Sequence, residues 1–146
     1  MSDAAVAPGI DLVILPEDSD TLPEWGELLK DESVEEPDGP VTLEDIDVLE
    51  DGESYVGGEE MLKRAIKFGN RAGLRAAKAL FRQQHLIPEE WRGKKVLVFT
   101  GTVVRDRDGL RLVAYLCWDG ARWYLRWLWL DGYFGSLCRA VRCSRK

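Results

Sequence analysis

The sequence predicts an α+β protein: one long basic amphipathic helix packed on a three- to four-stranded antiparallel β-meander, with an acidic, partly flexible N-terminal arm. Three observations favour this class. Residues 96–130 alternate apolar and polar side chains around tight-turn signals. Residues 59–85 repeat apolar side chains at helical spacing. Acidic side chains concentrate at the start of the chain. We expect an arm over residues 1–57 and a helix-plus-meander domain over residues 58–146.

The predicted meander is centred on Asp119-Gly120, because Asp-Gly readily supplies the positive φ angles of a type I′ hairpin turn. This turn fixes the register of the two flanking strands, and every residue that it pairs is apolar. Side chains alternate along a strand, so the paired residues share one face, which we expect to be buried. The expected pairs are Trp118 with Ala121, Leu116 with Trp123, Ala114 with Leu125, Leu112 with Trp127, and Leu110 with Trp129.

The preceding strand extends this face across a polar loop at residues 105–109. It is expected to place Val104, Thr102, Thr100, Val98 and Val96 beside Leu110, Leu112, Ala114, Leu116 and Trp118. The opposite face mixes apolar and cationic side chains, so either a helix covers part of it or it is a contact surface. That face carries Leu97, Phe99, Val103, Arg111, Val113, Tyr115, Cys117, Arg122, Tyr124, Arg126, Leu128 and Leu130. A fourth strand is expected around residues 137–143.

A single helix is predicted over residues 59–85, with Glu59 and Glu60 favouring its N-terminus through the helix dipole. Gly69 and Gly73 each cost roughly 1 kcal/mol of helix propensity relative to Ala. Because both glycines lie on the apolar stripe, they suggest a close approach to another backbone. The stripe expected to pack on the sheet comprises Leu62, Ile66, Gly69, Gly73, Ala76 and Leu80.

Charge is strongly segregated along the 146 residues. Residues 1–60 hold 20 acidic residues and 1 basic residue, whereas residues 61–146 hold 6 acidic and 19 basic residues. The basic side of the helix and the Arg/Tyr face of the sheet are candidates for binding a polyanion, and solvated faces are the alternative. The candidates are Lys63, Lys67, Arg71, Arg75, Lys78, Arg82, Arg111, Arg122, Tyr124 and Arg126.

The acidic arm contains short possible elements: an edge strand at residues 10–15 and helices over residues 23–30 and from residue 42 to about residue 50. Its apolar residues are embedded among carboxylates, a composition typical of a segment that folds on a partner. A solvated acidic tail is the simpler alternative. The candidate partner-binding residues are Leu22, Trp25, Leu28, Leu29, Leu43, Ile46 and Leu49.

No catalytic constellation is predicted, and we expect neither an enzyme nor a cofactor. His85 is the sole histidine, and no Ser or Cys can be paired with it by spacing. Cys117, Cys138 and Cys143 could join His85 in a zinc site, but they lack C-x-x-C spacing and are better explained as small buried side chains. We therefore expect no metal site.

The compartment expected from the sequence is the cytoplasm. Residues 1–30 lack a basic segment followed by an apolar one, no run approaches the length of a membrane span, and the three cysteines are an odd number. We expect no membrane interaction, and the sequence leaves the oligomeric state open.

The C-terminal part resembles an uncharacterised small domain that recurs in predicted bacterial proteins, especially from reduced-genome candidate phyla. The matching residues are Ile87-Pro88-Glu89-Glu90-Trp91-Arg92-Gly93, Val98-Phe99, Gly101-Thr102, Arg105-Asp106, Asp108-Gly109, Tyr115-Leu116, Trp118-Asp119-Gly120, Trp123-Tyr124-Leu125, Trp129-Leu130-Asp131 and Val141-Arg142. Thr100 stands where that pattern has Pro. The resemblance implies a β-module of bacterial or phage-like origin and supplies no functional residues.

Two functions are expected from these patterns. The first is a non-enzymatic interaction protein whose acidic arm binds a basic protein or nuclease-type complex. Such a protein would be inhibitor-like or antitoxin-like, or would mimic nucleic-acid charge as an anti-defence or anti-CRISPR-type inhibitor does. The alternative is a nucleic-acid-binding module that uses the basic helix and the Arg/Tyr sheet face, with binding that weakens steeply as salt rises.

Overall fold

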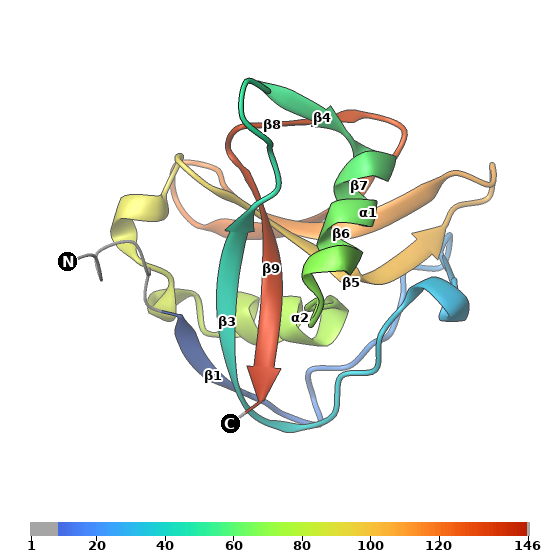
Figure 1. Cartoon of the computed structure of the whole chain (residues 1–146). Helices are drawn as coiled ribbons and strands as arrows, with labels where there is room; N and C mark the ends of the chain where they lie inside the picture. Colours follow the sequence, from blue (N-terminus) through green and yellow to red (C-terminus); the bar gives the residue numbers. More distant parts are fainter. Residues whose placement is uncertain (1–8, 146) are drawn as a thin grey trace.

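The structure, a computed structural model, describes residues 9–145. Figure 1 shows a strongly curved sheet with two short helices and a smaller two-stranded sheet. The helices are α1 (Gly58–Phe68) and α2 (Leu74–Arg82), and short 3-10 turns lie at Lys30–Glu32, Gln84–Leu86 and Glu89–Trp91. The strands are β1 (Ile10–Ile14), β2 (Glu27–Leu28), β3 (Gly39–Asp47), β4 (Tyr55–Gly57), β5 (Val96–Arg105), β6 (Arg111–Trp118), β7 (Trp123–Trp129), β8 (Tyr133–Gly135) and β9 (Cys138–Arg145).

The predicted fold class is wrong: the chain is mostly β, and no long helix packs on a meander in residues 9–145. Seven strands form one mixed sheet in the order β1-β3-β9-β5-β6-β7, with β2 paired to β5. Every pairing in this sheet is antiparallel except that of β5 with β9. Strands β4 and β8 pair separately.

The segment predicted as a partly flexible arm supplies strands β1, β2, β3 and β4. The predicted strand at residues 10–15 is present as β1. The helices predicted over residues 23–30 and from residue 42 are wrong, because β2 and β3 occupy those positions. Strand β3 alternates buried Val41 and Leu43 with less buried Thr42 and Glu44, the period-two pattern of a strand. Residues 1–8 lie outside the described residues.

The β6–β7 register differs from the predicted one by two residues. Trp118 lies opposite Trp123 and Leu116 opposite Leu125, because Asp119–Arg122 form a longer loop than the expected two-residue turn. The Asp119 N–H donates to the carbonyl of Arg122 (3.1 Å), and Asp119 Oδ1 accepts the N–H groups of residues 121 and 122. A shift of two residues leaves the same side chains on the same face, so Leu112, Ala114, Leu116 and Trp123 are buried as expected.

The β5–β6 register is also wrong, and here the shift changes faces. Leu97 rather than Val98 lies opposite Leu116, and three residues, Thr100–Thr102, bulge out between the Phe99–Ala114 and Val103–Val113 pairs. Leu97 and Phe99 therefore lie on the face of Ala114 and Leu116, where the sequence had predicted Val98. The bulge occurs where β5 meets the connection between the two helices.

The predicted continuous helix over residues 59–85 is broken at Gly69 and Asn70, whose φ angles of 82° and 54° are left-handed. Residues 69–73, called here the crossing segment, pass through the sheet between β9 and β5. The Ala72 N–H donates to the carbonyl of Val141 (3.0 Å), and the Ala72 carbonyl accepts the Gly101 N–H (2.7 Å). The expected close backbone approach is present at Gly73, because a Cβ on Gly101 would lie 2.8 Å from its nitrogen, but it is wrong for Gly69, where a Cβ would meet nothing within 4 Å.

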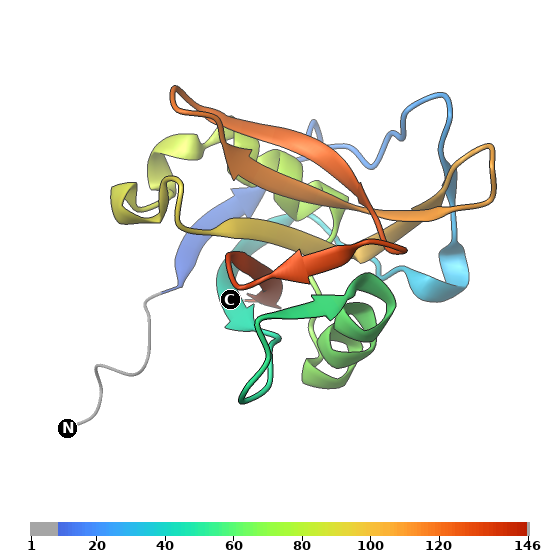
Figure 2. The same ribbon diagram turned by 90° about the horizontal axis from the view of Figure 1, so that it is seen from above.

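Crossing the sheet places the two helices on opposite sides, which Figure 2 shows from above. The predicted stripe is therefore divided. Ala76 and Leu80 of α2 pack with Phe99 and Leu116 in one core, whereas Leu62 of α1 packs with Val103 and Leu130 in another. Ile66 is 50% exposed. The mixed face of the meander is thus partly covered by α1 and by the β4–β8 sheet.

Candidate binding surface

The basic side of α2 binds the polypeptide chain itself. Arg75 Nε donates to the carbonyl of Asp18 (2.7 Å), and its Nη groups donate to the carbonyls of Leu15 and Glu36 and to the Asp38 carboxylate. Lys78 Nζ donates to the carbonyl of Thr21 (3.1 Å). We call this arrangement, in which Arg75, Lys78 and Arg82 hold residues 13–38, the α2 clasp.

Arg82 completes the clasp with a two-pronged contact to Asp18. Its Nε and Nη2 donate to the two carboxylate oxygens at 3.0 and 2.6 Å, and Nη2 also reaches the carbonyl of Val13. Burial alone would raise the pKa of Asp18, but the bonds from Arg82 and the Leu15 N–H outweigh burial and lower it. The Asp18 side chain is 4% exposed and that of Arg82 is 36% exposed, so the carboxylate is covered while the guanidinium reaches the surface.

Glu36 caps α2 from a distant part of the chain. Its carboxylate accepts the N–H groups of Gly73 (2.8 Å), Arg75 (2.9 Å) and Ala76 (3.3 Å), which have no partner within the helix. Burial raises the pKa of Glu36, and these N–H groups oppose that shift. The N-terminus of this cation-rich helix is therefore capped by an acidic residue of the predicted arm.

Two further polyanion candidates are also paired internally. Arg71 donates to the carbonyls of Thr100 (2.8 Å) and Glu32 (3.1 Å). Arg111 forms ion pairs with the carboxylates of Glu32 and Glu59. The guanidinium group of Arg71 thus links the β5 bulge to the segment around Glu32, and that of Arg111 links β6 to this segment and to α1.

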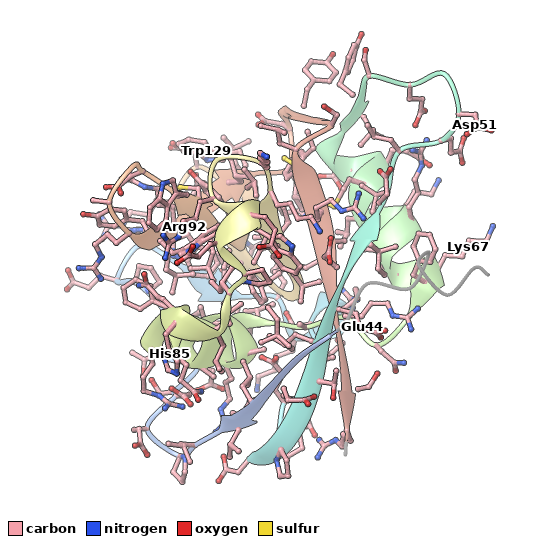
Figure 3. All side chains as sticks on the ribbon, turned by 90° about the vertical axis from the view of Figure 1, so that its left-hand side faces the viewer. Glu44, Asp51, Lys67, His85, Arg92 and Trp129 are labelled. Atoms are coloured by element: carbon pink, nitrogen blue, oxygen red, sulfur yellow. The ribbon has the colours of Figure 1, made fainter. Side chains whose placement is uncertain are left out.

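Helix α1 carries both paired and free cations. Arg64 holds Glu53 through two bonds of 2.6 and 3.0 Å, and this contact lowers the pKa of Glu53 to about 2. The side chain of Lys63 is 78% exposed, with a long contact to Glu60. Lys67 extends from α1 away from the body of the molecule (Figure 3). Of the predicted basic side of the helix, Lys63 and Lys67 of α1 face solvent, and Arg82 of α2 is exposed as well but is paired with Asp18.

The candidate anchors of the arm pack on the protein's own cores. Leu43 is 2% exposed in β3. Leu22 packs against the α2 core, and Leu29 and Leu49 against the α1 core. Leu28 pairs with Val104, Trp25 packs edge-to-face on Trp127, and Ile46 lies opposite Ala140. These residues fold the chain on itself.

Arg122, Tyr124 and Arg126 form the cationic surface that remains, called here the β7 surface. The guanidinium carbons of Arg122 and Arg126 lie 5.1 and 5.4 Å from the centroid of the Tyr124 ring. Arg122 also lies 5.4 Å from the Phe81 ring. Within residues 9–145 neither guanidinium has a carboxylate partner, and both residues are exposed.

The β7 surface lies on an edge of the sheet. Of the strands in the described part of the chain, β6 alone pairs with β7. Beside it, Arg92 lies 4.5 Å from the centroid of the Trp118 ring. Sequence reasoning missed Arg92 and Phe81 as members of this region. Only Trp118, which directly precedes Asp-Gly-Ala-Arg, could have indicated an aromatic partner at this turn.

The residues considered above for metal binding or catalysis lie apart in the structure. No cluster of three or more His, Cys, Asp or Glu side chains within residues 9–145 could hold a metal ion. Burial raises the pKa of Cys143 to about 11 and raises that of Cys138, so both thiols are held protonated. His85 is exposed (Figure 3). No helix among the described residues is long and apolar enough to cross a membrane.

No protein-family model, curated protein or solved structure matches the chain.

Proposed function

We propose that this chain is a non-enzymatic binding protein whose β7 surface holds a single-stranded nucleic acid. The observation that carries the proposal is that the exposed guanidinium groups of Arg122 and Arg126 flank the half-buried ring of Tyr124 and have no carboxylate partner in residues 9–145, whereas the cations of the α2 clasp are paired internally. Guanidinium groups bind phosphate oxygens, and aromatic rings stack on bases regardless of sequence.

The geometry suits a flexible strand better than a duplex. Arg122 and Arg126 are four positions apart, about 13 Å along an extended chain at roughly 3.3 Å per residue. Tyr124 lies between them, so phosphates can meet the two guanidinium groups while a base meets the ring. A duplex would withhold its bases from this ring, because they are stacked and paired inside the helix.

The test is fluorescence anisotropy with labelled 20-nucleotide single-stranded DNA and RNA, using the full chain at 50 and 200 mM salt. Two phosphate contacts predict that log K falls with log salt with a slope of about −1.4. Tyr124→Ala should weaken binding about tenfold, because base stacking on an aromatic ring contributes roughly 1–3 kcal/mol. The double variant Arg122→Gln, Arg126→Gln should remove most of the salt dependence.

Lys63→Gln combined with Lys67→Gln is the matched control, because it removes the same charge from exposed positions on α1. This control should bind within about twofold of the parent by the additivity of distant sites. The proposal is wrong if the parent does not bind, or if the control weakens binding as much as the β7 variant.

Binding of a basic protein is the second candidate function. It is favoured by the carboxylates of Glu17, Asp20, Glu24 and Asp31, which are exposed beside the α2 clasp. Its apolar anchors are occupied in the fold, so this binding would depend on charge and weaken steeply with salt. Neutralising Glu24 and Asp31 to Gln and Asn should reduce capture by a basic protein such as lysozyme without changing oligonucleotide binding.

A further inference from the structure

Three tryptophans and two aspartates line a groove of about 430 Å³ near the tip of the β5–β6 hairpin. Trp127 and Trp129 come from β7, Trp25 from the segment before β2, and Asp106 and Asp108 from the hairpin loop. In Figure 1 this loop projects at the right of the molecule, beside the blue segment that contains Trp25. The groove lies on the opposite face of β7 from Tyr124, because side chains alternate along a strand.

The indole rings form walls at right angles. Trp25 and Trp127 have centroids 5.9 Å apart and planes at 83°. Trp129 follows two residues after Trp127, on the same face, and is 51% exposed. Its Nε1 donates to Asp106 Oδ2 (3.1 Å), which fixes the orientation of the ring.

The charge of the groove is net negative. Asp106 Oδ1 accepts the N–H groups of Asp108 and Leu110, both at 2.9 Å, so this carboxylate is immobilised by the loop and the indole together. The hydrogen bond from Trp129 is the main cause of a lowered pKa for Asp106, which keeps it ionised. Asp108 is exposed, and Arg107 is the single cation among the lining residues.

We propose that this groove binds an alkylated ammonium group, such as the head of choline or a methylated lysine side chain. The negative faces of indole rings attract cations, and tryptophan does so most strongly. Alkyl groups offer apolar surface to the rings, whereas a bare ammonium is strongly hydrated and would need more hydrogen-bond acceptors than the groove provides. The same two carboxylates and ring faces repel anions, which distinguishes this groove from the β7 surface.

The test is a titration of the full chain with choline, compared with its neutral isostere 3,3-dimethylbutan-1-ol, by calorimetry and indole 1H–15N NMR. The chain has six tryptophans, so the indole signals report separate sites. Saturable choline binding is expected to shift the signals of Trp25, Trp127 and Trp129, with the isostere binding at least tenfold more weakly.

Two variants and one control keep the proposal falsifiable. Trp129→Ala should abolish choline binding, and Asp108→Asn, an exposed change, should weaken it about threefold to tenfold. Tyr133→Ala removes another exposed aromatic ring, 77% accessible and distant in the topology, and should leave binding unchanged. Equal binding of the isostere, binding of glucose instead of choline, or shifts of other indole signals alone would each overturn the proposal.

Discussion

The α2 clasp and the β7 surface both contain arginine side chains, but those of the clasp bind the chain itself and those of the β7 surface face outward. In the clasp, Arg75 is 16% exposed and directs its donors at carbonyls and at Asp38. On the β7 surface, Arg122 and Arg126 contact rings and keep their donors for solvent or ligand. The partners of each cation within the fold, rather than the density of basic residues in the sequence, therefore decide which cations can bind another molecule.

The largest expected effect comes from removing Arg75. Arg75→Ala should lower the free energy of unfolding by about 3–5 kcal/mol, because three carbonyls and a carboxylate lose their donor. Arg126→Ala, the same change on the β7 surface, should alter it by less than about 0.5 kcal/mol. Urea unfolding followed by circular dichroism measures both. Equal losses in the two variants would abolish the distinction between clasp and surface.

The clasp can also be disturbed through the crossing segment that places α2. A Cβ at residue 101 would lie 2.7–2.8 Å from the backbone of Ala72 and Gly73. Gly101→Ala should therefore cost about 3 kcal/mol in unfolding free energy and leave β7 intact. Gly132→Ala is the control, because the nearest atom to its Cβ, the carbonyl oxygen of Trp129, is 3.6 Å away. Thermal unfolding should separate the two variants by more than 5 °C.

A smaller effect is expected from pH and Asp18. The pKa of Asp18 is lower in the folded protein than its ordinary value of 3.8, so its contribution is complete above that value and is lost as pH falls through the folded pKa. Asp18→Asn should cost about 2 kcal/mol at pH 7 and flatten the loss of stability below pH 4. If the free energy of unfolding of this variant fell with pH as steeply as that of the parent, the Asp18–Arg82 ion pair would not contribute to the acid sensitivity of the fold.

The sequence predicts local features of this fold better than its long-range ones. The face shared by Leu112, Ala114 and Leu116 follows from alternation within residues 110–130, and it survives a register error of two. The β5 bulge does not follow from alternation, because it is fixed by Ala72, a residue far away in the sequence. Alternation of period two cannot foresee a partner that enters the sheet from outside the meander.

The single helix failed for a related reason. Residues 59–85 have helical periodicity throughout, and only tertiary hydrogen bonds to Val141 and Gly101 show that the middle of this segment is extended. The segregation of charge along the sequence was also misleading. It suggested one acidic and one basic binding region, whereas acidic residues of the first half pair with basic residues of α2 in the fold. Of the predicted site residues, Arg122, Tyr124 and Arg126 stay together on one surface, because Tyr124 and Arg126 alternate along β7 and Arg122 directly precedes this strand.

Strand β9 is the last strand in the described part of the chain, yet it lies inside the sheet between β3 and β5. During synthesis, β3 and β5 must therefore wait for residues 138–145 before the sheet can close. Pairings such as Asp47 with Arg139 join distant parts of the sequence, a topology that folds slowly. Until closure, two unpaired strand edges are exposed to neighbouring chains. Loss of the last residues of β9 should consequently cause aggregation of the nascent chain rather than only lower the stability of the folded monomer.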